Sequence, residues 1–430
     1  MVFSNSFHSD GIYHGLPDIP TTITGKSAIV CGSNGISGTH MLRVLKKSPQ
    51  RWSKVYSISR RPSMEPLPDH FSHLIIDLEM PVDEIATVLK QANVQADYVF
   101  YFAYKQPAPK PGSNPWSCAR ELAEINGTLF NNFLNSLTVA GIKPERILLQ
   151  TGTKNYGCHL GPYFCPGREE DPRIEQEPNF YYTEEDTMWK WCLQNKVDWN
   201  IAMPCVMQGT VRDGIQSIIN PIGVYAAIQK VLGRKMIWPS DFTAWETEQA
   251  QSNGYLNAYL EEWAVLNPEA ANEKFNATDG SYFTWARAWP RIAARYGIEW
   301  EGPSEANEGK YQVTETYTVP PPIGYGGTAR VRIHSSLAAW SQEPKVRETW
   351  YKLAKEQGLP MEYIEKTDRF WFADYILAWS WPITQSMDKT RKMGFMGTCN
   401  SEEAIIDLIK ECEELHILPN VLLNEDNVKD

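Results

Sequence analysis

Short, continuous apolar segments alternate with amphipathic helical segments up to residue 204, and this alternation limits the fold more than any other feature of the chain. The helical periodicity is clear at 38–45, where Met41, Leu42 and Leu45 fall on one face. Strands with continuous apolar sequence are buried on both faces, so the pattern predicts a parallel, doubly wound α/β sheet covered by helices. We expect its strands at residues 27–31, 54–59, 73–77, 97–102, 146–150 and 198–203.

The alternation fades after residue 205, where helical segments rich in aromatic residues take over. Three of these segments are 255–263, 283–296 and 370–381. We therefore expect a sheet-based core at 25–205 and a largely helical lobe at 206–430 that packs on the core. Residues 1–24 are rich in Gly, Pro, Asp and Ser, which predicts an irregular lead-in.

The composition excludes several kinds of partner. A formal charge of −11 argues against nucleic acid or an anionic membrane surface. No apolar run approaches the roughly 20 residues of a membrane span, and the N-terminal residues do not have the pattern of a signal peptide. Eight cysteines follow no disulfide or zinc spacing, so we expect reduced thiols, no metal and a cytoplasmic location.

Residues 32–38 read Gly-Ser-Asn-Gly-Ile-Ser-Gly and join the first expected strand to the first expected helix. At such a junction, backbone amides and the helix N-terminus can hold a pyrophosphate. Gly32 suits the tight turn, Gly35 the approach of phosphate and Gly38 the packing of helix on strand. A purely structural turn could also contain three glycines, but the strand–turn–helix context predicts a Rossmann-type dinucleotide site, with Asn34 and Ile36 beside the cofactor.

The ends of the next two strands indicate which dinucleotide would bind. Ser59, Arg60 and Arg61 follow the second strand, where an enzyme specific for NAD has an acidic residue for the ribose hydroxyls. Guanidinium groups match phosphate geometry, so the pair of arginines predicts NADPH rather than NADH. Asp77 and Leu78 end the third strand and are expected over the adenine. The alternatives are a solvated basic turn and an ordinary carboxylate at a strand end.

A lysine and a tyrosine further along suit a reductase. Lys154 follows the fifth strand directly, Tyr181 comes 27 residues later, and both are expected at the carboxyl edge of the sheet. An ammonium near Tyr181 would lower its phenol pKa, and the phenol could stabilise charge on a carbonyl oxygen. A core role is the alternative for Tyr181 and the better interpretation of Tyr182. Glu185 and Asp186 are expected to cap the following helix.

Six segments together resemble a known family, the progesterone 5β-reductase/iridoid synthase-like branch of the short-chain dehydrogenases, over about residues 25–420. Ordinary short-chain dehydrogenases carry Tyr-x-x-x-Lys on one helix, and this motif does not follow the fifth strand here. The Asn-Phe-Tyr-Tyr sequence is specific to this branch. The segments are Gly32-x-x-Gly35-x-x-Gly38, Val55-Tyr56-x-x-Ser59-Arg60-Arg61-Pro62, Leu149-Gln150-Thr151-Gly152-x-Lys154-x-Tyr156, Asn179-Phe180-Tyr181-Tyr182-x-x-Glu185-Asp186, Val224-Tyr225-Ala226-Ala227-Ile228 and Ser386-Met387-x-Lys389 through Gly394-Phe395.

The resemblance implies an NADPH-dependent reductase of the activated C=C bond of an apolar enone or enal. Hydride would add to the β-carbon, with Tyr181 as catalytic tyrosine at the enolate oxygen and Lys154 as catalytic lysine. The residues expected at the cofactor are Gly32, Asn34, Gly35, Ile36, Ser59, Arg60, Arg61, Asp77, Leu78, Ala103, Thr151, Tyr181, Pro204 and Val206. The residues expected in the substrate pocket are Tyr104, Tyr182, Cys205 and Met207.

Departures from the family pattern concern the substrate. Thr153 stands where members often have Arg, Ala103-Tyr104 where Thr-Trp is common, and 203–205 read Met-Pro-Cys in place of Arg-Pro-Gly. We therefore expect a substrate other than a plant steroid or iridoid, in a pocket closed by the helical lobe. Tyr104 would form one wall, with 370–372 or 376–377 as candidates for another.

Other outcomes remain open at this stage. The same fold and cofactor would also suit carbonyl or imine reduction, or a cyclisation or isomerisation in secondary metabolism. A dinucleotide-binding regulator without chemistry is a third possibility, against which the presence of both Lys154 and Tyr181 argues. A homodimer is possible.

Overall fold

The computed structural model describes residues 6–107, 118–212, 214, 216–316 and 318–421. Its central strands are β3 (Lys26–Cys31), β4 (Trp52–Ser59), β5 (Phe71–Ile75), β6 (Tyr98–Tyr101), β7 (Arg146–Gln150), β8 (Asp198–Pro204) and β12 (Glu273–Ala277). They form one sheet in the order β12-β8-β7-β6-β3-β4-β5, and every neighbouring pair is parallel. This is the doubly wound Rossmann-type sheet that the sequence predicts, and all six expected strands are present.

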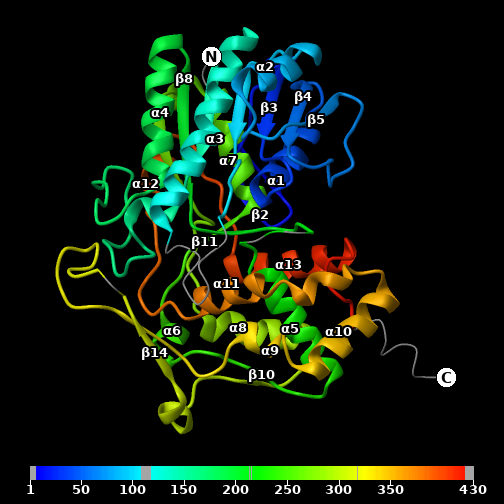
Figure 1. Ribbon diagram of the computed structural model, residues 1–430, viewed down its shortest axis with the longest axis vertical. Coiled ribbons are helices and arrows are strands. Elements are labelled where there is room, and N and C mark those ends of the chain that lie inside the picture. Colours follow the sequence, from blue (N-terminus) through cyan, green and yellow to red (C-terminus); the bar gives the residue numbers. More distant parts are fainter. Residues whose placement is uncertain (1–5, 108–117, 213, 215, 317, 422–430) are drawn as a thin grey trace.

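Helices cover both faces of the sheet (Figure 1). One face carries α1 (Ile36–Lys46) and α7 (Gly254–Leu266), and the other carries α2 (Val82–Gln91), α3 (Ala119–Ala140) and α4 (Phe180–Asn195). Side chains of β3 alternate between the two layers: Ala28 and Val30 pack with the α1/α7 layer, and Ile29 and Cys31 with the opposite one. This two-residue period, apolar on both faces, explains the continuous apolar runs in the sequence.

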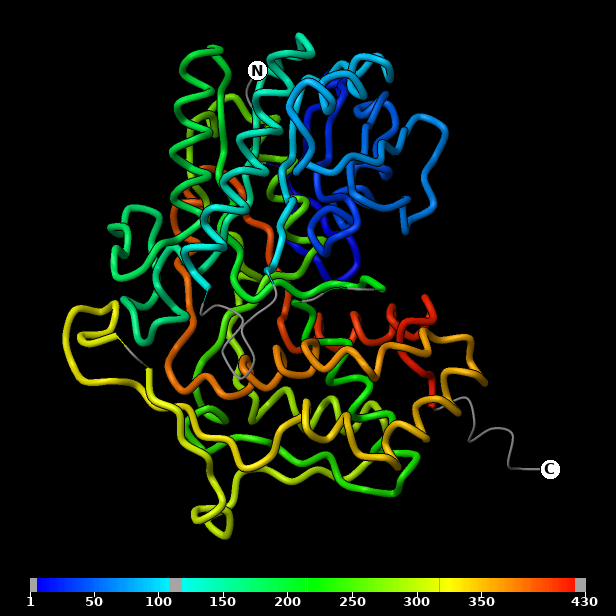
Figure 2. The backbone as a smooth tube through the Cα atoms, viewed as in Figure 1, coloured from blue at the N-terminus to red at the C-terminus, as the bar shows by residue number. Residues whose placement is uncertain are grey.

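The sheet also includes chain from beyond residue 205. The seventh strand, β12, pairs with β8, and α7 precedes it on the face shared with α1. Figure 2 shows that the chain leaves the helical lobe after residue 377, runs up beside the sheet and returns to the lobe at residue 401; on the way, α12 (Asp388–Lys392) contacts β12. The core and the lobe are therefore interleaved along the chain, and the sheet crosses the expected boundary at residues 205 and 206.

The helical lobe lies below the carboxyl end of the sheet in Figure 1 and has an aromatic interior. Trp238, Trp285 and Trp289 are fully buried and contact one another, and Trp245 packs on Trp238. This interior is continuous with the α2/α3/α4 face of the sheet in one apolar cluster. The helices of the lobe are α5 (Ile219–Val231), α6 (Phe242–Glu246), α8 (Trp285–Arg295), α9 (Leu337–Trp340), α10 (Pro344–Gln357), α11 (Thr367–Leu377) and α13 (Ser401–Glu414).

The expected irregular lead-in is wrong, because β1 (Phe7–Asp10) and β2 (Tyr13–Pro17) form an antiparallel hairpin. Gly11 turns the chain with a φ of 60°, and the hairpin is held against the rest of the molecule by buried Leu16 and by Tyr13, whose hydroxyl donates to Asn253. The strands were not predicted because turn-forming residues are frequent in this short segment and interrupt the strand pattern.

The remaining short strands are β9 (Val206–Gln208) with β11 (Gln251–Asn253), β10 (Met236–Ile237) with β13 (Trp300–Glu301), and β14 (Gln312–Glu315) with β15 (Arg330–Ile333). Four short 3-10 helices, Thr153–Tyr156, Pro268–Ala270, Glu305–Lys310 and Met361–Glu365, complete the regular structure of the described residues. Across those residues, no helix combines the length and the apolar character that crossing a membrane requires.

Candidate active site

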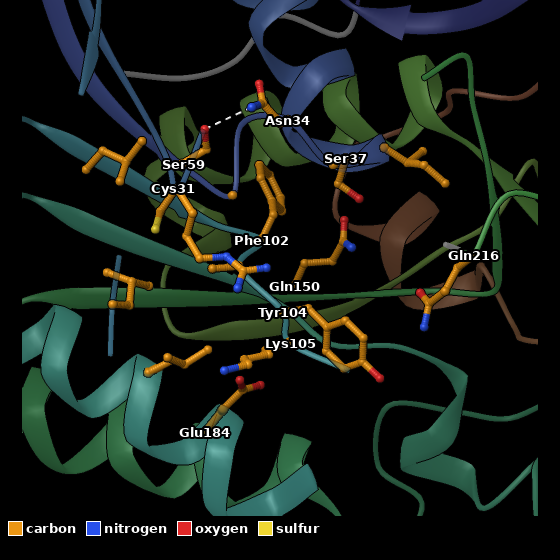
Figure 3. Close-up of a pocket in the computed structure, with 18 of the residues that line it drawn as sticks. Cys31, Asn34, Ser37, Ser59, Phe102, Tyr104, Lys105, Gln150, Glu184 and Gln216 are labelled. Atoms are coloured by element: carbon orange, nitrogen blue, oxygen red, sulfur yellow. Dashed lines mark hydrogen bonds between the residues drawn. The ribbon is translucent and has the colours of Figure 1, made fainter. Parts of the chain in front are cut away.

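A cavity of about 310 Å³ opens at the carboxyl end of the parallel strands (Figure 3). The segments after β3, β4, β5, β6 and β7 converge there, and the start of α4 forms its floor. This is where ligands bind in open α/β sheets. The predicted residues that line it are Gly32, Asn34, Gly35, Ile36, Ser59, Arg60, Arg61, Asp77, Leu78, Ala103, Tyr104, Thr151, Tyr181 and Met207.

The turn between β3 and α1 presents backbone amides to one end of the cavity. Gly32 has a φ of 84°, and a Cβ there would lie 2.6 Å from backbone atoms of Phe102 and Ala103. At Gly38 a Cβ would lie 2.4 Å from the carbonyl oxygen of Gly32, so only glycine lets the helix start this close to the turn. No side chain caps α1 at Gly35, and its first turn has no acidic residue. Uncapped amides at a helix N-terminus fit a pyrophosphate.

Asn34 organises the neighbouring turn after β4 rather than only facing a ligand. Its side-chain amide donates to Ser59 Oγ at 3.0 Å and to the Pro62 carbonyl at 2.9 Å, and its Oδ1 accepts from the Met64 amide at 3.1 Å. The bond to Ser59 is drawn in Figure 3. These bonds couple the phosphate turn to the segment that carries Arg60 and Arg61, which are both exposed and line the cavity.

Asp77 and Leu78 line the same end of the cavity, after β5. Asp77 Oδ1 accepts from the amide of Glu79 at 3.0 Å, and the Leu78 carbonyl accepts from Asn132 on α3 at 2.9 Å. The Leu78 side chain is buried and offers an apolar surface to a flat ring. This end of the cavity therefore combines amide donors, two guanidinium groups and an apolar wall, and the residues present fit a dinucleotide.

Tyr181 lies in the first turn of α4, at the other end of the cavity. Asn179 caps the helix by accepting from the Tyr181 amide at 3.1 Å, and donates to the Lys154 carbonyl at 3.0 Å. The capping residue thus joins the two segments expected to carry the chemistry. A Cβ at Gly152 would lie 3.0 Å from the Tyr181 hydroxyl, so this glycine leaves room for the phenol beside β7.

The expectation that Lys154 lowers the pKa of Tyr181 is wrong. Burial raises the Tyr181 pKa well above its ordinary value, and the proximity of Tyr104 and Glu184 acts in the same direction. The phenol therefore stays protonated at neutral pH and is a hydrogen-bond donor.

Lys154 is not in the wall of the large cavity within the described part of the chain. It lines a small neighbouring cavity of about 10 Å³ with His159 and Glu177, which contact each other at 2.5 Å between Nε2 and Oε1. Its Nζ lies 5.8 Å from the centre of the Phe180 ring, which in turn packs on Tyr181 with ring centroids 4.2 Å apart. Desolvation lowers the pKa of Lys154 to about 8, so its charge is only partly maintained above neutral pH.

Tyr182 faces away from the large cavity, as far as the described residues define that cavity. Its hydroxyl donates to the Asn155 carbonyl at 2.7 Å and accepts from the Ile174 amide at 2.9 Å, which is the structural role that the sequence favours. The expected capping role of Glu185 and Asp186 is wrong, because α4 already begins at Phe180. Glu185 lies within α4, and its side chain is fully buried and pairs with Arg173 and Lys274.

Three further predicted residues, Pro204, Cys205 and Val206, are not among the described residues that line the cavity. The Pro204 carbonyl accepts from Thr153 Oγ1 at 3.1 Å, and the Cys205 amide donates to Ser252 Oγ at 2.8 Å. Val206 starts β9 and pairs with Gln251. These residues anchor the chain as it leaves β8, and only Met207 of this segment lines the cavity.

The lobe contributes less to the wall than expected. The first segment of the lobe contributes three cavity residues, Met207, Gly214 and Gln216. Among the described residues of 370–377, none lines the cavity. Phe370 and Leu377 are fully buried in the apolar core of the lobe, so the proposed second wall is wrong: aromatic density there serves packing.

Several wall residues escaped the sequence analysis. Phe102 and Gln150 are the last residues of two predicted strands and adjoin predicted site residues, so counting the final strand residue as part of the site would have found them. Phe180 and Glu184 belong to α4, and Glu184 shares a helix face with Tyr181 at a spacing of three. Two more wall residues are Leu129, which lies on α3, and Gln216. The local sequence does not mark either one as a site residue, because only the tertiary fold brings them to the cavity. In the described residues, no group of three or more His, Cys, Asp or Glu side chains could hold a metal ion.

Comparison with known proteins places this arrangement in context. The sequence matches the PRISE-like Rossmann-fold domain over residues 74–319. The 3-oxo-Delta(4,5)-steroid 5-beta-reductase of Arabidopsis thaliana is 28% identical over 415 residues, which cover 94% of this chain and 95% of that protein. The (S)-8-oxocitronellyl enol synthase of Catharanthus roseus is 27% identical over 406 residues, 91% of this chain and 92% of that one. The short chain dehydrogenase gsfE of Penicillium aethiopicum is 27% identical over 401 residues, 92% of this chain and 99% of that one.

Among solved structures, the Bordetella bronchiseptica enzyme WbmG in complex with NAD superposes with a TM-score of 0.56 at 11% sequence identity, covering 93% of this chain and 98% of that chain. At this identity the likeness concerns the fold. It extends over almost the whole chain, so the lobe as well as the sheet has a counterpart in a known structure.

Proposed function

The chain belongs to the PRISE-like Rossmann-fold family, and from this premise we propose that it is an NADPH-dependent reductase of the activated C=C bond of an apolar enone or enal. The observation that carries the proposal is the Tyr181 phenol. It lines one end of a cavity whose other end has an amide-rich turn suited to a pyrophosphate, and its raised pKa keeps it protonated.

The names of the relatives support this reaction class. A 3-oxo-Δ(4,5)-steroid carries a carbonyl conjugated to a C=C bond, and an 8-oxocitronellyl enol synthase forms an enol. Both names describe chemistry in which an enol or enolate oxygen needs stabilisation. A hydrogen-bond donor at that oxygen serves either one.

The preference for NADPH follows from the turn after β4. Arg60 and Arg61 line the cavity, and the side-chain hydrogen bonds of Asn34 hold their segment against the phosphate turn. Guanidinium groups held there would bind a 2′-phosphate. The uncapped amides of α1 would bind the pyrophosphate, and Leu78 would pack on the adenine.

Tyr181 would donate its phenolic proton in a hydrogen bond to the carbonyl oxygen of the substrate. Bound NADPH would supply the hydride for the β-carbon. Negative charge then grows on the carbonyl oxygen, and a neutral phenol stabilises this charge more in the transition state than in the ground state. The protonated state set by burial is the one that this role needs, because a phenolate could not donate.

The apolar walls would favour an apolar substrate and keep water out. Phe102, Tyr104, Phe180 and Met207 line the cavity, and the Tyr104 ring packs on Phe180, next to Tyr181, with centroids 5.5 Å apart. A hydrogen bond to an enolate is stronger in such surroundings than in water.

The proposal is tested with the purified protein, NADPH and a panel of enones, enals, saturated aldehydes and ketones. Loss of NADPH absorbance is followed, and products are identified by mass spectrometry and NMR. We expect turnover of enones or enals to the saturated carbonyl compound, with deuterium from labelled NADPH at the β-carbon. Products reduced only at C=O would reject the C=C assignment, and binding of NADPH without turnover of any substrate would favour a regulatory protein.

A further inference from the structure

Glu184 is a buried carboxyl group in the wall of the large cavity that the proposed chemistry does not use. Only 2% of the residue is exposed, yet it lines the cavity, and Figure 3 shows its carboxyl pointing from α4 toward the interior of the site. Among the described residues, no hydrogen bond or ion pair holds this carboxyl. An unpartnered buried polar group is costly, so its retention at a cavity calls for a partner in a bound ligand.

Several other buried carboxyl groups have partners, and Glu261 on α7, whose two carboxyl oxygens have none, is not in the described wall of the cavity. Glu185, the next residue, bonds Asn155, Arg173 and Lys274. Asp374 accepts from Ser336 and from two backbone amides at 2.6–3.0 Å. Glu184 is therefore distinguished from these groups by facing the cavity without a protein partner.

The position of Glu184 identifies which part of a dinucleotide it could reach. It follows Tyr181 by three residues on α4, so the two side chains lie on one face of the helix about 5–6 Å apart at Cβ. Its proximity contributes to the raised pKa of Tyr104 and of Tyr181, which places it among the groups of the reactive end. In a dinucleotide stretched from the phosphate turn to Tyr181, one ribose with two hydroxyl groups lies between the pyrophosphate and the reactive ring.

We propose that the Glu184 carboxyl binds the hydroxyl groups of this ribose, next to the nicotinamide of the bound cofactor. The inference rests on the proposed dinucleotide binding and adds a contact that fixes the reactive ring relative to Tyr181. A neutral carboxyl offers one donor and one acceptor, which suits a pair of hydroxyl groups. Burial and the nearby charge of Glu185 raise the Glu184 pKa well above its ordinary value. The Glu184 carboxyl is therefore neutral and does not repel the phosphates of the ligand.

The test compares two ligands by titration calorimetry, without turnover. NADP⁺ contains the ribose in question, whereas adenosine 2′,5′-bisphosphate has the adenosine end alone. Glu184→Leu should weaken NADP⁺ binding about tenfold, the equivalent of one to two lost hydrogen bonds, and leave the bisphosphate affinity unchanged. Glu184→Gln retains a donor and an acceptor and should bind NADP⁺ within about threefold of the unmodified protein.

Two controls separate binding from folding. Glu261 is fully buried on α7, has a raised pKa and is not in the described wall of the cavity, so Glu261→Leu removes a comparable carboxyl elsewhere and should not change NADP⁺ affinity. The ligand-free Tm of Glu184→Leu should equal or exceed that of the unmodified protein, because an unpartnered carboxyl is lost. Glu184→Ala provides a smaller substitution if the leucine does not fit.

Each outcome decides the inference. An unchanged NADP⁺ affinity in Glu184→Leu and Glu184→Ala overturns it, as does equal weakening of both ligands, which would indicate a distorted cavity. A raised KM for the enone with unchanged NADP⁺ affinity would assign Glu184 to the substrate instead and also overturns it. If the unmodified protein binds neither ligand, the proposed dinucleotide function itself fails.

Discussion

The two ends of the cavity are built in different ways. The phosphate end comes from residues 32–37 and 58–61, two short segments whose backbone groups and arginines are set by local sequence. The Tyr181 end brings together three separate segments, which contribute Tyr104 after β6, Gly152 after β7 and Phe180 on α4. Backbone recognition of phosphate depends on the shape of one turn, whereas a pocket for a substrate depends on how distant segments pack. The first can be recognised from sequence, and the second cannot.

The largest expected effect is at the turn of the phosphate end. Gly32→Ala forces a Cβ to 2.6 Å from backbone atoms of Phe102 and Ala103, in addition to the cost of a left-handed φ. Gly141 is the matched control, because its φ is 75° and a Cβ there would meet nothing within 4 Å. We expect Gly141→Ala to lower the free energy of unfolding by about 1–2 kcal/mol. Gly32→Ala should lower the free energy of unfolding by about 1–3 kcal/mol more than Gly141→Ala does, as measured by urea denaturation. It should also abolish NADP⁺ binding.

The next effect concerns the Tyr181 end. Tyr181→Phe should lower turnover of an enone by at least about tenfold, and by about a hundredfold if the phenol acts as a full oxyanion donor, with NADP⁺ affinity unchanged. Tyr182→Phe should leave turnover nearly intact and instead lower the free energy of unfolding by about 1–3 kcal/mol, since the Ile174 amide and the Asn155 carbonyl lose their partner. The reverse pattern would exchange the roles of the two tyrosines.

A smaller effect is expected for cofactor choice. Replacing Arg60 and Arg61 together by alanine should reduce the preference for NADPH over NADH by about tenfold or more, because each charge-assisted hydrogen bond contributes roughly 1.5–3 kcal/mol. Dissociation constants for both cofactors measure it, and the affinity for NADH serves as the control because it lacks the 2′-phosphate. Equal affinities in the unmodified protein would remove the basis of the comparison.

The smallest effect belongs to Lys154, which stands apart from both ends. Its pKa of about 8 lies below that of an unburied lysine, so the ammonium is lost as the pH rises through about 8. If that charge assists Tyr181, kcat/KM should fall several-fold above pH 8, and Lys154→Arg should move the fall to higher pH because guanidinium stays charged. A profile that is flat from pH 7 to 9 in the unmodified protein would make Lys154 structural.

The charge of Lys154 also affects stability, with a defined sign. Because the folded-state pKa lies below the ordinary value of 10.5, the folded protein binds this proton less tightly than the unfolded chain. The contribution of Lys154 to the free energy of unfolding therefore increases as the pH rises from about 8 to 10.5 and is constant below about 8. Lys154→Met should remove this increase, which chemical denaturation at several pH values would detect.

Much of the architecture was determined by sequence alone. Continuous apolar runs fix strands buried on both faces, and the six expected strands appear in the sheet. The turn at 32–38 is equally local, because the left-handed φ of Gly32 and the close contact at Gly38 leave little alternative to glycine. For the same reason Arg60, Arg61, Asp77 and Leu78 could be placed at the cavity from their positions at strand ends.

Tertiary structure alone decided the rest. The seventh strand, β12, reads Glu-Lys-Phe-Asn-Ala and does not have the continuous apolar sequence of the predicted strands, so it is recognised only from its pairing with β8. Whether a side chain beside Tyr181 reaches the cavity depends on helix phase: α4 begins at Phe180, which turns Glu184 inward and buries Glu185 among Arg173 and Lys274. The protonation of Tyr181 likewise depends on the surrounding protein, since burial is the largest cause of its raised pKa.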